Sequence, residues 1–183
     1  MKKVLAVIVL FSAAIGVNAQ SKESKGKSNA IKVNLFSPIV KTGSFFYERA
    51  VSDKSSAQLG VGFTSYNRSG IKISGLFFTP EYRMYLSGQS LNGFYVAPFA
   101  RYQNLKIEDN SGASEAKATL STYGGGVTVG RQWLFGNIVS FDIFAGPSYN
   151  SGTVKVTDGD EVDVPGSFRG FGARVGLTLG VAF

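Results

Sequence analysis

The 183-residue sequence contains neither cysteine nor histidine, and these two absences exclude much chemistry. Without cysteine there is no disulfide framework, no thiol nucleophile, no thiolate zinc site and no lipid-anchoring residue. Without histidine there is no Ser-His-Asp triad and no histidine metal site. Charged residues are also few, at 17% against 44% hydrophobic, which argues against general disorder. The length allows one domain with a sizeable core.

The start of the chain has the layout of a secretory signal peptide rather than of a folded element. Two lysines are followed by a mainly apolar stretch and then by small residues. The apolar stretch is shorter than the roughly 20 residues that a membrane-spanning helix needs. We therefore expect residues 1–19 to be a signal peptide, cleaved between Ala19 and Gln20. The mostly polar segment 20–29 is expected to be a disordered periplasmic leader.

From residue 30 onward, apolar residues recur at every second position, which is the period of a β-strand. The clearest case is 170–183, where apolar side chains alternate with glycine, threonine, alanine or arginine. One face of such a strand is continuously apolar, while the other is small or polar. The fourth strand is expected to bulge near Gly75. The eight predicted strands are about 30–40, 44–52, 57–66, 71–86, 93–106, 116–131, 139–150 and 169–183.

The predicted connections alternate in length, with two exceptions: strands one to two and three to four join through the short segments 41–43 and 67–70. Short segments near 52–56, 87–92 and 132–137 join strands two to three, four to five and six to seven. Longer segments, 104–115 and 151–166, join strands five to six and seven to eight. An Asp-Gly pair between alternating runs in the second long segment predicts a hairpin that extends the last two strands as a ribbon. Short turns at one rim and longer loops at the other are typical of outer-membrane barrels.

The pattern predicts an all-β fold: an eight-stranded antiparallel transmembrane β-barrel with up-and-down meander topology over 30–183. An even number of antiparallel strands closes without an edge, so every backbone group is paired inside lipid. The alternative is a soluble barrel or sandwich with its apolar face inward. Its exterior would then include the glycine- and threonine-rich face of the last strand, which lacks solubilising charge.

Aromatic residues concentrate near the ends of the predicted strands, as amphipathic rings do at membrane interfaces. The outer girdle is expected to contain Phe45, Tyr102, Tyr149 and Phe171, and the inner one Tyr82, Phe94, Trp133, Phe141 and Phe183.

Alternation also turns a set of charged residues toward the inside of the barrel. Eight strands leave room there only for side chains, and unpaired buried charges are costly, so opposite charges should meet. We expect Arg83 and Arg174 to contact at least two of the carboxylates of Glu48, Glu81 and Asp142, which would fill the lumen. The predicted ion-pair network comprises Glu48, Glu81, Arg83, Arg101, Asp142 and Arg174, and Lys32 also turns inward outside this set.

On these features the chain resembles the small OmpA/OmpX-type outer-membrane β-barrel proteins of Gram-negative bacteria. The resemblance rests on the signal peptide, the strand count, the terminal Phe183 and the runs 79–86 and 93–98, which look like barrel domains of unknown function. It implies a monomer in the outer membrane, with periplasmic termini and with lipid and lipopolysaccharide around it. In such proteins a terminal aromatic residue, preceded by alternating apolar ones, is recognised by the barrel-assembly machinery. The matching residues here are Leu177, Leu179, Val181 and Phe183.

Two functions remain open from the sequence. The first is a structural or cell-surface interaction role, in envelope integrity or adhesion, with an extracellular partner bound through loops 104–115 and 151–166. The second is a small gated pore or transporter. An enzyme is least favoured, because known outer-membrane enzymes of this architecture use a histidine. No catalytic, cofactor or metal residue is predicted, and no basic patch interleaved with aromatics indicates nucleic acid.

One acidic cluster leaves a calcium site open. Its members are Asp158, Asp160, Glu161 and Asp163. Hard cations prefer several carboxylates, but this spacing matches no EF-hand, and a solvated hairpin tip explains the cluster more simply.

Overall fold

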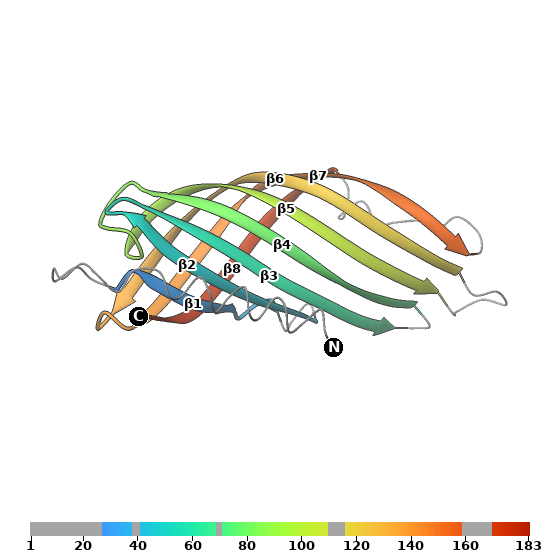
Figure 1. The fold of residues 1–183 in the computed structure, drawn as a ribbon, viewed down its shortest axis with the longest axis horizontal. Helices are drawn as coiled ribbons and strands as arrows, with labels where there is room; N and C mark the ends of the chain where they lie inside the picture. Colours follow the sequence, from blue (N-terminus) through green and yellow to red (C-terminus); the bar gives the residue numbers. More distant parts are fainter. Residues whose placement is uncertain (1–26, 38–40, 69–70, 110–115, 159–169) are drawn as a thin grey trace.

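The computed structural model describes residues 27–37, 41–68, 71–109, 116–158 and 170–183. Eight strands form a single closed sheet (Figure 1). Each strand is antiparallel to its neighbours along the chain, and β1 also pairs with β8, which closes the barrel. The prediction of an all-β, eight-stranded antiparallel barrel with meander topology is confirmed. The strands are β1 (Asn29–Asn34), β2 (Thr42–Ser52), β3 (Ser55–Arg68), β4 (Ile71–Tyr85), β5 (Gly93–Asp109), β6 (Ala116–Phe135), β7 (Val139–Asp158) and β8 (Gly170–Ala182).

The two ends of the barrel differ in their connections. At one, which we call the turn end, short connections at 53–54, 86–92 and 136–138 join the strands. The backbones of Asn29 and Phe183 exchange two hydrogen bonds there, at 3.1 and 2.8 Å, so both ends of the barrel domain meet at this rim (Figure 1). The opposite end, which we call the loop end, carries the connections between β1 and β2, β3 and β4, β5 and β6, and β7 and β8.

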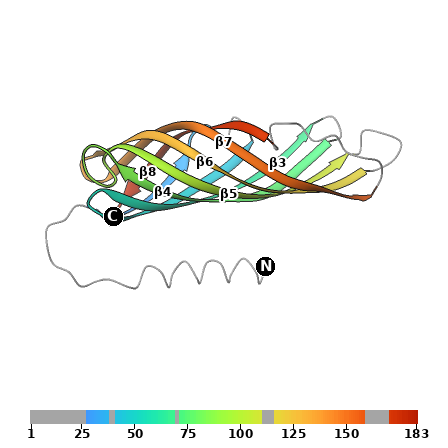
Figure 2. The ribbon, with the colours of Figure 1, turned by 90° about the horizontal axis from the view of Figure 1, so that it is seen from above.

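Three strands project furthest toward the loop end. β5, β6 and β7 have 17, 20 and 20 residues, whereas β8 has 13. Figure 2 shows the three longer strands extending past the start of β8. Gly170, the first residue of β8, pairs with Asn150, and β7 continues beyond that pair to Asp158. Over 151–158, where the sequence predicts the ribbon, β7 continues and pairs with β6. The expected partner residues, 161–164, lie outside the described residues.

The first strand is shorter than the sequence predicts. It ends at Asn34 rather than near residue 40. The side-chain oxygen of Asn34 accepts a hydrogen bond from the backbone N–H of Phe36 at 3.0 Å. Such a local bond offers the backbone an alternative to the ladder and starts a turn.

The connection between β6 and β7 is tighter than the predicted segment 132–137. β6 continues to Phe135, and the N–H of Ile138 donates to the Phe135 carbonyl at 3.0 Å. Gly136 and Asn137 between them have φ angles of 56° and 59°. Two successive left-handed residues make the type I′ turn whose twist matches antiparallel strands, and glycine and asparagine tolerate it best.

The bulge predicted near Gly75 is absent. The pairing of β4 with β3 and with β5 runs through Gly75 without a change of register. A Cβ atom at this position would collide with the backbone carbonyl of Asn104 on β5. The glycine therefore permits close approach of two strands.

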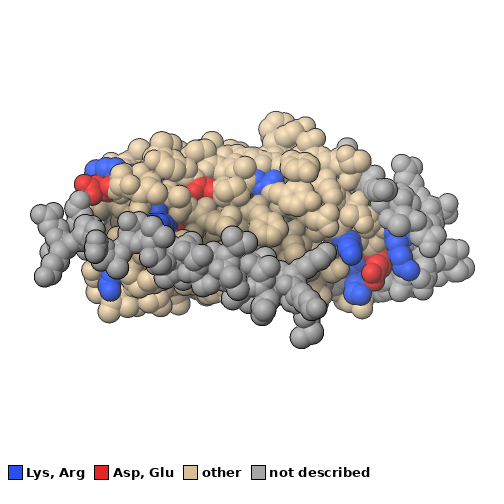
Figure 3. Space-filling view, viewed as in Figure 1, with Lys and Arg blue, Asp and Glu red and all other residues tan. Residues whose placement is uncertain are grey.

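The barrel is apolar outside and polar inside. Large apolar residues stand exposed along its wall, including Phe45, Phe63, Leu76, Val129, Ile143 and Leu179. Charged side chains on the face drawn in Figure 3 lie mostly toward the two ends. The fully buried large side chains include Arg83, Lys32, Gln132 and Glu48. This distribution is opposite to that of a lipocalin-type barrel and excludes the alternative with an apolar interior.

Aromatic rings pair along the outer wall. Tyr102 contacts Tyr123 with ring centroids 5.0 Å apart, and Tyr149 contacts Phe171 at the same separation toward the loop end. Near the turn end, the ring centroids of Trp133 and Phe141 lie 5.6 Å apart. No helix of the described residues is long and apolar enough to cross a membrane.

Candidate functional site

The described residues include six charged side chains that are at most 5% exposed. They come from five strands, and alternation directs each of them into the lumen. Three are cations and three are carboxylates, so their formal charges sum to zero. They are Lys32 on β1, Glu48 on β2, Glu81 and Arg83 on β4, Asp142 on β7 and Arg174 on β8.

Arg83 is the centre of this group and contacts all three carboxylates. Its Nη1 lies 2.8 Å from Asp142 Oδ2 and 3.4 Å from Glu48 Oε2. Its Nε donates to Glu81 Oε1 at 2.6 Å. The guanidinium also lies over the ring of Tyr95, 4.3 Å from the centroid. One arginine thus joins β2, β4 and β7 across the lumen.

Lys32 also belongs to this group. Its Nζ forms an ion pair with Glu48 and lies 3.4 Å from Asp142 Oδ2. Alternation turns Lys32 inward, but the predicted network contains Arg101 in its place. Arg101 makes no ion pair among the described residues. Phe99 on β5 is the register partner of Glu81, and Arg101 lies two residues beyond Phe99 toward the loop end. Glu81 already forms ion pairs with Arg83 and Arg174.

Neutral side chains complete the hydrogen bonding of the carboxylates. Tyr95 donates to Asp142 Oδ1 at 2.8 Å. The Tyr85 hydroxyl lies 2.7 Å from Glu48 Oε1 and 2.6 Å from Gln132 Oε1, and Ser56 also donates to Glu48. The sequence prediction missed these partners because it considered charged residues alone. The available signal was alternation, which places Tyr85 on the same face as Arg83.

Arg174 forms the layer above this cluster, on its loop-end side. It forms an ion pair with Glu81. Its guanidinium lies 4.5 Å from the ring centroid of Phe99 and 4.7 Å from that of Phe144, both of which are buried. Gly176 pairs with Phe144 across β7 and β8, and a Cβ there would collide with the Phe144 ring. The glycine therefore gives the ring room to lie inside the barrel.

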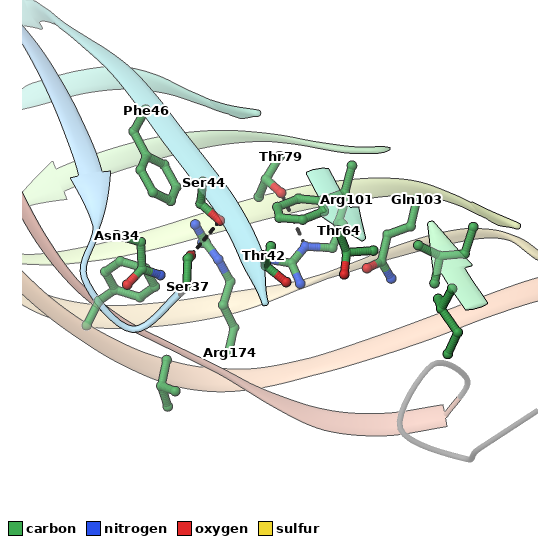
Figure 4. A pocket seen from close by; sticks show the side chains of 15 residues that line it. Asn34, Ser37, Thr42, Ser44, Phe46, Thr64, Thr79, Arg101, Gln103 and Arg174 are labelled. Carbon is green, nitrogen blue, oxygen red and sulfur yellow. Dashed lines mark hydrogen bonds between the residues drawn. The ribbon is translucent and has the colours of Figure 1, made fainter. Parts of the chain in front are cut away.

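A cavity of about 510 Å³, which we call the vestibule, lies beyond Arg174 at the loop end (Figure 4). The side chains of Arg101 and Arg174 reach into the same space. Arg101 Nε donates to Thr79 Oγ1 at 3.2 Å, and its guanidinium lies 5.4 Å from the Phe77 ring. The lining residues are Asn34, Ser37, Thr42, Ser44, Phe46, Thr64, Ile73, Phe77, Thr79, Arg101, Gln103, Leu105, Phe144, Arg174 and Val175.

The predicted assembly residues lie on β8 or, for Phe183, directly after it, and β8 closes the barrel by pairing with β1. Leu179, Val181 and Phe183 are 42, 54 and 44% exposed on the outer wall, and Leu177 is half-buried. β8 pairs there with both β1 and β7. The predicted cleavage site at Ala19 and Gln20 lies outside the described residues.

The predicted acidic cluster lies outside the part of the chain whose side chains are described. Within the described part, no three acidic residues group so as to hold a metal ion.

The fold and the lumen together define a class: a closed eight-stranded meander barrel, apolar outside and ion-paired inside. The chain matches a protein family over residues 6–180, described as "Protein of unknown function (DUF3575)", and it belongs to that family. Among solved structures it is similar to the N-terminal β-barrel domain of Pseudomonas aeruginosa OprF. The two share 14% sequence identity with a TM-score of 0.47, and the match covers 87% of this chain and 100% of that one. The comparison with curated proteins found no match.

Proposed function

We propose that this protein is an outer-membrane β-barrel whose plugged lumen gives it a structural or cell-surface interaction role. The first support is the outer wall. Exposed apolar side chains on this scale would be costly in water but are matched to lipid hydrocarbon. The sheet closes on itself, because β1 pairs with both β2 and β8, and closure is what a bilayer requires of a sheet. Export through the signal peptide at 1–19, with periplasmic termini at the turn end, completes this arrangement.

The observation that carries the functional part is the buried, charge-neutral network around Arg83. It links strands on different sides of the lumen, and its members are at most 5% exposed. Ions and solutes would have to displace paired charges to pass. A barrel of this kind is a rigid body in the membrane, suited to envelope integrity or to presenting a surface to a partner.

The projecting strands are the part of the molecule best placed for an extracellular partner. β5, β6 and β7 extend beyond the start of β8. In the described residues, the 151–158 part of β7 pairs only with β6. Strand edges of this type accept a further strand from a partner. The described parts of the predicted interaction loops 104–115 and 151–166, namely 104–109 and 151–158, belong to this projection.

The assembly signal is part of the same proposal. Leu177, Leu179, Val181 and Phe183 lie on the strand that closes the barrel against β1. Outward side chains of this strand are accessible before closure, so the barrel-assembly machinery can bind them.

The second candidate function is a gated pore. The vestibule favours it, because about 510 Å³ of open space leads from the loop end to the Arg174 layer. In this reading the ion pairs around Arg83 separate transiently and form a gate.

Cell fractionation and gel mobility test the membrane assignment. We expect the mature protein in the outer-membrane fraction, and we expect unheated samples to migrate differently from boiled ones, because a closed barrel resists detergent until heat opens it. A soluble periplasmic protein with no heat-dependent shift would refute the proposal.

A further inference from the structure

The vestibule contains a positive charge, that of Arg101, which no carboxylate of the described residues pairs with. The three buried carboxylates are all engaged by Lys32, Arg83 or Arg174. Arg101 adds a seventh charge to the lumen and forms no ion pair with a described residue. Its Nε donates to a neutral hydroxyl, that of Thr79, at 3.2 Å.

The rest of the vestibule combines apolar and hydroxyl surfaces. The rings of Phe46, Phe77 and Phe144 line it, and they leave an apolar space beside the guanidinium. Ser37 and Ser44, hydrogen-bonded to each other at 2.8 Å, supply polar groups on the β1–β2 side. Its volume of about 510 Å³ lies within the range of small-molecule sites. A mostly apolar cavity with a few fixed polar groups is the usual form of such a site.

We propose that the vestibule binds a small organic monoanion that carries a compact apolar group, such as an aromatic carboxylate. The ligand carboxylate pairs with the Arg101 guanidinium. This charge-assisted hydrogen bond is stronger than the bond that Arg101 now donates to the Thr79 hydroxyl. The apolar group packs among the phenylalanine rings. The ligand enters from the loop end and stops at the Arg174 layer. Binding therefore needs no opening of the lumen and does not depend on whether the barrel conducts.

Calorimetric titration of the folded full-length mature chain in neutral detergent tests this site. The probes are 2-naphthoate, its neutral amide 2-naphthamide, and acetate. Naphthoate should bind, whereas the amide and acetate should each bind at least about tenfold more weakly. The amide lacks the negative charge that pairs with Arg101, and acetate lacks the aromatic group that packs among the phenylalanine rings. Arg101→Gln should weaken naphthoate binding at least about tenfold. Arg101→Lys should recover part of the loss.

Lys72→Gln is the matched control. It removes one positive charge at the same end of the barrel but outside the cavity, where Lys72 forms an exposed pair with Glu108 at 3.2 Å. Naphthoate affinity should not change in this variant. Heat-dependent gel mobility shows that each variant is folded, and Thr64→Phe, which narrows the vestibule, replaces any arginine variant that fails this check.

Three outcomes would overturn the proposal. The first is no saturable naphthoate binding up to about 1 mM. The second is equal affinity for acid and amide, or for naphthoate and acetate. The third is unchanged affinity in folded Arg101→Gln or Thr64→Phe.

Discussion

Replacing Arg83 with methionine is expected to lower the free energy of unfolding by about 3–5 kcal/mol. The arginine contacts Glu48, Glu81 and Asp142, and all four side chains are buried. Its removal leaves the network of six buried charges with one uncompensated negative charge. Urea titration in detergent micelles, followed by Trp133 fluorescence, measures the change.

A compensating change separates charge balance from packing. Asp142→Asn in the Arg83→Met background restores neutrality, so the double variant should be more stable than Arg83→Met alone. Lys72→Met should cost less than about 1 kcal/mol, because its pair with Glu108 is exposed. If Arg83→Met were no more costly than Lys72→Met, the network would not stabilise the barrel.

An arginine introduced on the outer wall should lower the free energy of unfolding, and the decrease should grow with the depth of the residue in the membrane. Leu177 lies near the middle of β8, and its side chain faces outward opposite Ile143. We expect Leu177→Arg to lower the free energy of unfolding in lipid vesicles by about 2–4 kcal/mol, because a charged side chain at the membrane midplane loses its hydration.

Phe171→Arg is the control for depth. Phe171 belongs to the same outward face of β8 but stands at the loop-end rim, where it is 88% exposed. The cost at this position should be at least about 2 kcal/mol smaller than at Leu177. Equal costs at both positions would show that the outer wall does not face hydrocarbon.

Alternation alone predicts the barrel, its strand count and the inward direction of the charged residues. It does so because a strand has a strict period of two, so Arg83 or Glu48 cannot turn outward without moving its whole strand. The expected contacts of Arg83 and Arg174 with Glu48, Glu81 and Asp142 are present. Alternation does not define the full membership of the network, because that depends on the stagger between strands around the barrel. Lys32 therefore joins the network through Glu48 and Asp142, whereas Arg101, which the prediction included, lies in the vestibule.

The loop end was predicted least well, for a physical reason. In the projecting part of β5, Leu105 and Ile107 take the inward positions and are buried. The inward face thus changes from polar to apolar along a single strand. The prediction assumed that inward residues are polar and outward residues apolar. A segment with apolar inward residues does not fit this assumption, so the prediction placed a loop over 104–115. The early end of β1 escaped prediction because it depends on one side-chain bond of Asn34.

Planar-bilayer recording with purified, folded wild-type protein tests the plugged lumen most directly. Gel mobility first shows that the barrel is closed. The account predicts no stable channels, because the paired charges around Arg83 fill the lumen. Rare, small openings that grow in Arg83→Ala would support the gated pore instead. Large, stable channels from the wild-type protein would contradict the plug.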